Sequence, residues 1–226
     1  MRLLDPEFWR RRLTNPKVIA GMVVDSLPIV GVLLWGWGAA PLVLLYWMEN
    51  LIIGVMTLPR LVLSGVRYGA LGIIGGAGMA LFFTFHYGLF CYVHGVFLSV
   101  FFAGPDFSPG APGLSGFMDM IRIALTSGEH LNLAVYTLVA WHFLMLMWDF
   151  GVRGEWRRTT PVEEMVRPYQ RVVVLHIGLF VGAGALIALG DPMIGVLGLI
   201  LLRVLWGIVA NGDREAKSTP EPSAAI

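Results

Sequence analysis

The feature that most constrains this chain is a series of apolar runs about twenty residues long, the length of a helix that crosses a bilayer. Hydrophobic residues make up 57 % of the 226 residues and charged residues only 14 %, whereas a soluble domain carries about 25 % charged residues. Backbone groups inside a bilayer find no water to bond, so such runs are expected to be helical. The sequence therefore predicts an all-α, polytopic membrane helix bundle and argues against a soluble enzyme or a disordered chain.

Hydropathy divides the chain into six predicted transmembrane helices. They cover residues 18–38, 41–60, 74–103, 131–150, 169–189 and 192–210. Only a few residues separate the first two, so these are expected to form an antiparallel hairpin. Pro28 lies inside the first and is expected to kink it.

The segments outside the spans complete the predicted domain organisation. Residues 1–17 and 116–126 mix apolar with charged side chains, which favours short interfacial helices on the cytoplasmic and outer faces respectively. Residues 211–226 are polar and are predicted to be a disordered cytoplasmic tail. The chain is thus divided into an interfacial segment 1–17, a six-span domain 18–210 and a tail 211–226.

Basic side chains gather in alternate segments between the predicted spans. The N-terminal stretch, the segments after spans two and four, and the tail carry most of the Arg and Lys residues. The opposite side carries Asp106, Asp119, Glu129 and Asp191, with Arg122 as its fixed cation. Because cytoplasmic loops are enriched in Lys and Arg, the pattern places both termini in the cytoplasm and predicts a multi-pass protein of the cell membrane.

Ionisable side chains inside the predicted spans are the main functional signal. Each charged side chain at the bilayer centre costs about 2.5–3.5 kcal/mol on insertion scales. The spans nevertheless contain Asp25, Glu49, His86, His94, His142, His176 and Arg203. At a rise of about 1.5 Å per residue, all of them lie within about 8 Å of the midpoint of their span. This shared depth predicts one polar site in the middle of the bundle.

Imidazoles and carboxylates together are the ligands of zinc and non-haem iron sites. The candidate metal ligands are His86, His142, His176, His94 and Glu49. Asp25 is the candidate general base if Glu49 is a ligand, and Arg203 is expected to pair with a carboxylate or to bind an anionic head group or oxyanion. The leading hypothesis is a metal-dependent membrane enzyme, a hydrolase that acts on a lipid-like or hydrophobic substrate through zinc- or iron-activated water.

Three other functions fit the same residues. Two histidines on facing helices, such as His86 and His142, could ligate a haem b for electron transfer. A proton- or ion-coupled transporter or channel, possible as a homo-oligomer, would use the carboxylates, the histidines and Arg203 as a relay. A structural subunit embedded in membrane lipids would use them as a fixed hydrogen-bond network. The net charge of +1 excludes a nucleic-acid binder of the basic-stripe kind.

Two short segments of spans two and three combine aromatic residues with glutamate, asparagine and histidine. They are Tyr46-Trp47-Met48-Glu49-Asn50 and His86-Tyr87-Gly88-Leu89-Phe90-Cys91-Tyr92-Val93-His94-Gly95. The pair resembles a family of prokaryotic multi-pass membrane proteins of unknown function, which joins a Tyr-Trp-x-Glu-Asn segment in one span to a His-Tyr/Phe-Gly-x-Phe-x-x-x-His-Gly segment in the next. The resemblance implies a location in the prokaryotic inner membrane, and it implies no activity.

Overall fold

The computed structural model describes residues 10, 14, 16–101, 113–128, 130–169, 172–173 and 198. In that part of the chain all regular secondary structure is helical, as predicted. Three helical stretches within it are long and apolar enough to cross a membrane: Pro16–Trp35, Ala39–Ser99 and Leu131–Val152. Most of the last two predicted spans, the tail and most of segment 1–17 lie outside the described residues.

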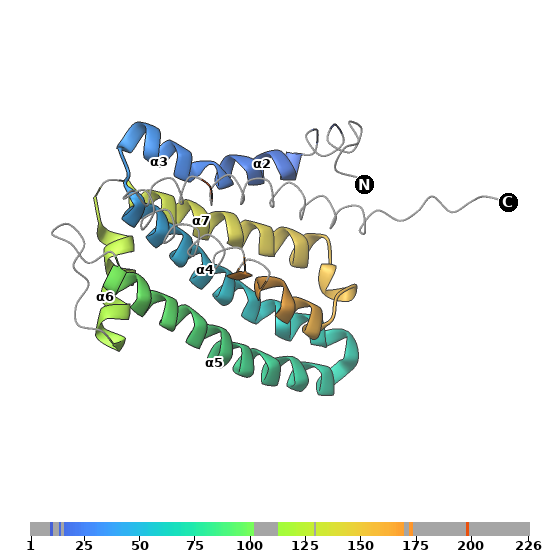
Figure 1. Ribbon diagram of the computed structural model, residues 1–226. Helices are drawn as coiled ribbons and strands as arrows, with labels where there is room; N and C mark the ends of the chain where they lie inside the picture. The colour runs from blue at the N-terminus through green and yellow to red at the C-terminus, as the bar shows by residue number, and fades with distance from the viewer. Residues whose placement is uncertain are drawn as a thin grey trace.

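The first stretch is divided into α2 (Pro16–Asp25) and α3 (Leu27–Trp35). The break falls at Ser26, two residues before Pro28, whose missing N–H and ring disfavour a continuous regular helix. The helix is thus interrupted close to the proline at which a kink is predicted. Gly36 ends α3 with a positive φ of 65°, which a residue without a Cβ adopts at no steric cost. The chain then reverses into α4, and α7 (Leu131–Leu146) lies between α2 and α4 (Figure 1).

The second stretch is a hairpin of two long helices. Helix α4 (Ala39–Gly65) leads through the 3₁₀ turn η2 (Val66–Tyr68) into α5 (Gly69–Phe101). With 27 and 33 residues, the two helices are about 40 and 50 Å long. Each limb alone exceeds the hydrocarbon core of a bilayer, about 30 Å. A Cβ on Gly65 would lie 2.1 Å from the carbonyl oxygen of Gly72, so this tight turn requires glycine.

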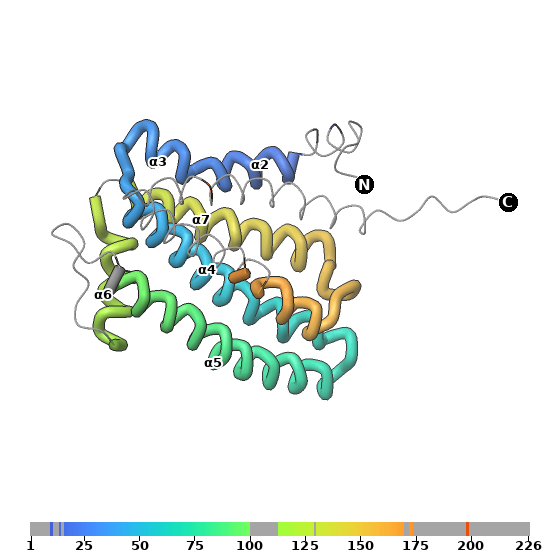
Figure 2. Tube along the Cα trace, viewed as in Figure 1, coloured from blue at the N-terminus to red at the C-terminus, as the bar shows by residue number. Residues whose placement is uncertain are grey.

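The remaining described elements cover the ends and one side of this hairpin. Helix α6 (Leu114–Thr126) lies across one end of the bundle, and α7 (Leu131–Leu146) packs along α4 (Figures 1 and 2). Helix α7 continues into the π-helical turn η3 (Met147–Val152), which the 3₁₀ turn η4 (Glu155–Arg157) follows. A further helical stretch covers residues 161–169. The helix predicted over 116–126 is thus present as α6.

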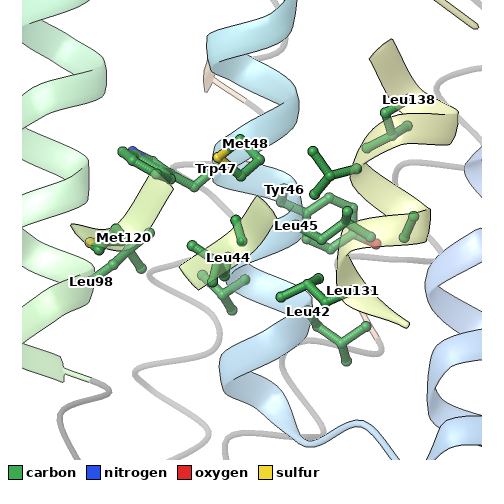
Figure 3. Close-up of a cluster of buried hydrophobic side chains, with 14 of the residues drawn as sticks. Leu42, Leu44, Leu45, Tyr46, Trp47, Met48, Leu98, Met120, Leu131 and Leu138 are labelled. Carbon is green, nitrogen blue, oxygen red and sulfur yellow. The ribbon is translucent and has the colours of Figure 1, made fainter. Parts of the chain in front are cut away.

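The main hydrophobic core is centred on α4. Figure 3 shows Trp47 and Tyr46 on opposite sides of this helix, Trp47 toward α5 and Tyr46 toward Leu131 and Leu138 of α7. Met120 of α6 is fully buried against the same cluster. Contacts with α5, α6 and α7 hold α4 in place. They therefore also fix where the side chains on its remaining faces lie.

The helical stretch 161–169 begins with a capping box. The backbone N–H of Thr160 donates to Glu163 Oε2 at 2.9 Å, and the backbone N–H of Glu163 donates to Thr160 Oγ1 at 3.3 Å. Such reciprocal bonds satisfy amide groups that have no partner in the first helical turn. The bond from the Thr160 amide is also the main reason that the pKa of Glu163 lies below its ordinary value.

We expect Thr160→Ala to lower the free energy of unfolding by about 1 kcal/mol, because the cap hydroxyl is lost. Glu163→Gln should lower the free energy of unfolding by a smaller amount, and this amount should depend on pH. Since folding lowers the pKa of Glu163, its stabilising contribution is present above the unfolded pKa and is lost as pH falls through the folded pKa. Thermal unfolding in detergent should show a difference between wild type and E163Q at neutral pH that vanishes in acid. A difference independent of pH would contradict the ionised cap.

Candidate functional site

Helices α2, α4 and α7, together with the residues that follow α7, present charged side chains to one cavity of about 180 Å³. Its ionisable lining residues are Lys17, Asp25, Glu49, Arg60, His142, Asp149, Arg153, Glu155, Glu164 and Arg167. On α4 the lining positions Glu49, Ile53 and Thr57 are four residues apart, which places them on one helix face. The cavity therefore follows one face of α4, on which polar and apolar side chains alternate with each other.

Glu49 and His142 face each other in the wall of this cavity. Helices α4 and α7 bring Glu49 Oε1 to 3.6 Å from His142 Nε2. The Glu49 side chain is 5 % exposed and that of His142 is 15 % exposed. The other ring nitrogen of His142, Nδ1, lies 2.9 Å from the carbonyl oxygen of Leu138. A carbonyl only accepts, so Nδ1 carries a hydrogen and donates it.

This hydrogen bond determines what the Glu49–His142 pair can do. With Nδ1 protonated, a neutral imidazole turns the lone pair of Nε2 toward the Glu49 carboxylate, and two electron-rich atoms would face each other. A proton on either group turns this repulsion into attraction. The separation of 3.6 Å is longer than a direct hydrogen bond but short enough to tighten on protonation. One proton shared between the two groups would therefore favour their contact.

Asp25 lines the same cavity from α2 and is only 8 % exposed. Eight residues earlier on α2, Lys17 forms an ion pair with Asp149, with Nζ 2.5 Å from Oδ1. Asp149 lies in the π-helical turn η3, and such turns occur frequently at functional sites. This ion pair joins α2 to η3 at the end of the cavity away from Glu49.

A second charged network connects α4 to the stretch 161–169. The Glu164 side chain is 1 % exposed, with Oε2 3.6 Å from Arg60 Nη1 and Oε1 2.5 Å from Arg167 Nη1. Thr159 Oγ1 donates to the same carboxylate at 2.8 Å. The Arg60 guanidinium also lies over the Phe150 ring, 4.8 Å from its centroid. A buried carboxylate surrounded by donors in this way is a fixed part of the cavity wall.

The two histidines of α5 lie outside this cavity. His86 Nδ1 is 2.8 Å from the Tyr169 hydroxyl, and its ring stacks on Phe82 at a centroid separation of 5.4 Å. His94 Nδ1 donates to the carbonyl of Phe90 in its own helix at 2.7 Å. The structure thus brings together Asp25, Glu49 and His142 of the predicted site residues, but it does not bring His86 or His94 to them.

Two predicted site residues, His176 and Arg203, lie outside the described residues. Within the part of the chain that is described, no group of three or more His, Cys, Asp or Glu side chains could hold a metal ion. A three-ligand set drawn from the predicted histidines and Glu49 would therefore need His176.

The two aromatic segments of α4 and α5 meet in the structure. Trp47 Nε1 donates to the carbonyl of Cys91 at 2.9 Å, and the Tyr87 hydroxyl donates to the carbonyl of Asn50 at 3.2 Å. A Cβ on Gly95 would lie 2.8 Å from Trp47 Cζ2, so glycine leaves room for the indole. Trp47, Tyr87 and Gly95 of these two segments thus build the contact between α4 and α5. Glu49, in the first segment, lines the cavity instead.

The sequence pattern assigned the basic residues at the Lys17 end of the cavity to membrane topology and gave Glu164 no role. Lys17, Arg60, Glu164 and Arg167 all line the cavity. A signal for two of them was available, because Lys17 precedes Asp25 by eight residues and Arg60 follows Glu49 by eleven. Both spacings return to the same helix face.

Comparison with known proteins gives one family match. The family model described as "Family of unknown function (DUF6498)" matches residues 7–224. No curated protein and no solved structure matches the chain.

Proposed function

Since the chain belongs to a family of unknown function, DUF6498, we propose its function from the cavity itself: proton-coupled transport of a small polar solute across the prokaryotic inner membrane. The observation that carries the proposal is the Glu49–His142 pair, a carboxylate and an imidazole 3.6 Å apart in the wall of a charged cavity. In the proposed function this pair binds one proton. Buried ionisable pairs of this kind form the proton relays of membrane pumps and transporters.

The proposal includes the six-span topology with both termini in the cytoplasm. In this orientation the end of the cavity at Lys17 and Arg60 faces the cytoplasm, because the arginine-rich segments lie on that side. Glu49 lies eleven residues from Arg60 along α4, or about 16 Å deeper. A proton or a solute entering from the cytoplasm would thus reach the pair about halfway through the bilayer.

The balance of charge in the cavity favours a solute that carries both signs. Its lining contains five carboxylate residues and four fixed cations, besides His142. A cavity of about 180 Å³ is well below the roughly 300–1,000 Å³ of pockets for drug-sized ligands. We therefore place a small zwitterion, such as a free amino acid, first among the substrate classes.

The Lys17–Asp149 ion pair gives the cavity a means of opening. It joins α2 to the π-helical turn η3, and π turns are sites of local irregularity in a helix. Separating the pair would release α2 from η3. In the proposed cycle, the proton and the solute bind in the same cavity. Proton binding therefore changes the affinity for the solute by the same factor by which solute binding changes the affinity for the proton.

The test is proton movement in vesicles. Tag-free protein is reconstituted into liposomes containing a pH-sensitive dye, and solutes are added by class: zwitterionic amino acids, mono- and dicarboxylates, and organic amines. We expect one class to drive proton flux that protein-free vesicles do not show. Proton flux that is the same with and without every class would contradict coupled transport.

A metal-dependent hydrolase is the second candidate, and one observation favours it. Metal-binding histidines commonly donate their second ring N–H to a backbone carbonyl, as His142 does to Leu138. His142 Nε2 then points toward Glu49 Oε1, so two potential ligands are adjacent and His176 is the candidate third.

Elemental mass spectrometry on tag-free protein tests this second candidate. Near-stoichiometric zinc or iron that is lost in H142A would favour the hydrolase over the carrier. Iron accompanied by a Soret absorption band would instead favour haem b. Metal content at background level in both proteins would contradict the metal-dependent enzyme.

A further inference from the structure

Two arginines that are ninety residues apart in sequence meet at the end of the bundle where α4 turns into α5. Arg67 lies in η2, and its Nη1 donates to the backbone carbonyl of Arg157 in η4 at 3.1 Å. Both side chains are exposed. Neither guanidinium forms an ion pair with a carboxylate among the described residues. The fold thus brings the two segments that carry these arginines together, and an anion bound by both guanidinium groups would offset their like charges.

Each guanidinium is supported by an aromatic ring. The Arg67 guanidinium lies 4.6 Å from the ring centroid of Tyr68, and that of Arg157 lies 4.8 Å from the ring centroid of Trp156. Stacking on a ring engages the face of the guanidinium and leaves its N–H edges available. A guanidinium has five N–H donors, and the bond from Arg67 to the Arg157 carbonyl uses one of those on Arg67.

Exposed apolar side chains flank this arginine pair where α4 turns into α5. Val66 is 38 % exposed and Leu71 is 84 % exposed, on either side of Arg67 and Tyr68. Figure 1 shows the turn between α4 and α5 at the end of the bundle. Tyrosine and tryptophan concentrate at the level of lipid head groups. The pair therefore lies where exposed apolar residues meet aromatic and basic ones, as at a membrane surface.

We infer that Arg67 and Arg157 form a binding site for the phosphate of an anionic phospholipid head group. The planar N–H edges of arginine match phosphate oxygens in paired hydrogen bonds. The exposed apolar residues beside them would contact the acyl chains. This site is separate from the cavity, since neither arginine lines it, and the inference does not depend on the transport proposal.

Native mass spectrometry of the detergent-purified full chain tests the site, with phosphatidylglycerol and phosphatidylcholine added at equal concentrations. We expect wild type to retain phosphatidylglycerol preferentially. R67Q and R157Q should each weaken its binding roughly fivefold, the effect of one basic residue at an anionic surface, and the double variant should weaken it further. Equal binding by wild type and the double variant would overturn the inference.

A matched control is Arg122→Gln, which removes the same charge from α6. Arg122 is exposed and pairs with Asp119 three residues away, so R122Q should bind phosphatidylglycerol as wild type does. A loss in R122Q equal to that in R67Q would show general charge attraction and overturn the site. Glycerol phosphate, added as a competitor, should leave the lipid bound. Displacement by this soluble phosphate would overturn the assignment to a lipid.

Discussion

Replacing Glu49 by Gln should abolish solute-driven proton flux while the helix bundle remains folded. Glutamine has the shape of protonated glutamate and cannot lose or gain the proton. The pair with His142 Nε2 would then no longer exchange a proton with the cavity. Because an amide can still hydrogen-bond at this position, the free energy of unfolding should fall by no more than about 1–3 kcal/mol.

Infrared difference spectroscopy of the protein in lipid vesicles, recorded between neutral and acidic pH, measures the proton directly. Wild type should show a carboxylic-acid carbonyl band that E49Q lacks, and H142Q should shift its pH midpoint. Asp119→Asn is the matched control, because Asp119 is paired with Arg122 on α6 and lies outside the cavity. D119N should keep both the band and the proton flux. An unchanged flux in E49Q would contradict the assignment of Glu49 as the proton-binding group.

The position of Glu49 shows how far sequence reasoning reaches for the candidate site. Depth in the membrane follows from counting residues along each predicted span, and the structure brings Asp25, Glu49 and His142 to one cavity. Depth does not give the direction of a side chain around its helix. His86 has a similar predicted depth but reaches Tyr169, because the neighbour that each helix face meets depends on packing between helices. The sequence offers no local signal for that packing.

The fold was more predictable, and its departures have simple causes. Helix α4 continues from Arg60, where its predicted span ends, to Gly65, because the residues after the arginine are again apolar and Leu61 is fully buried. The π-helical turn η3 interrupts the end of α7 at Asp149, and nothing in the hydropathy of 131–150 predicts a change of helix type. The pairing of Lys17 with Asp149 joins residues 132 positions apart, which a single sequence does not reveal.

The largest loss of stability is expected from Trp47→Ala. The Trp47 side chain is 1 % exposed in the main core, and its indole N–H donates to the carbonyl of Cys91. Removing a buried tryptophan leaves a cavity and costs about 3–5 kcal/mol. Trp47→Phe keeps most of the volume and loses the hydrogen bond, so its cost should be nearer about 1 kcal/mol. Denaturant or thermal unfolding in detergent measures both, and equal losses in the two variants would contradict a packing role.

Gly95→Ala tests the same contact from α5. The added Cβ would lie 2.8 Å from Trp47 Cζ2, so the helices must separate or the indole must move, at a cost of about 1–3 kcal/mol. Gly88→Ala is the matched control on the same helix, because a Cβ there meets nothing within 4 Å, and it should be neutral or slightly stabilising. In the W47A background the contact with the indole disappears and Phe117 Cδ2, 3.3 Å from the added Cβ, is the remaining close neighbour, so G95A should then cost less. Additive losses in the double variant would show that Gly95 acts independently of Trp47.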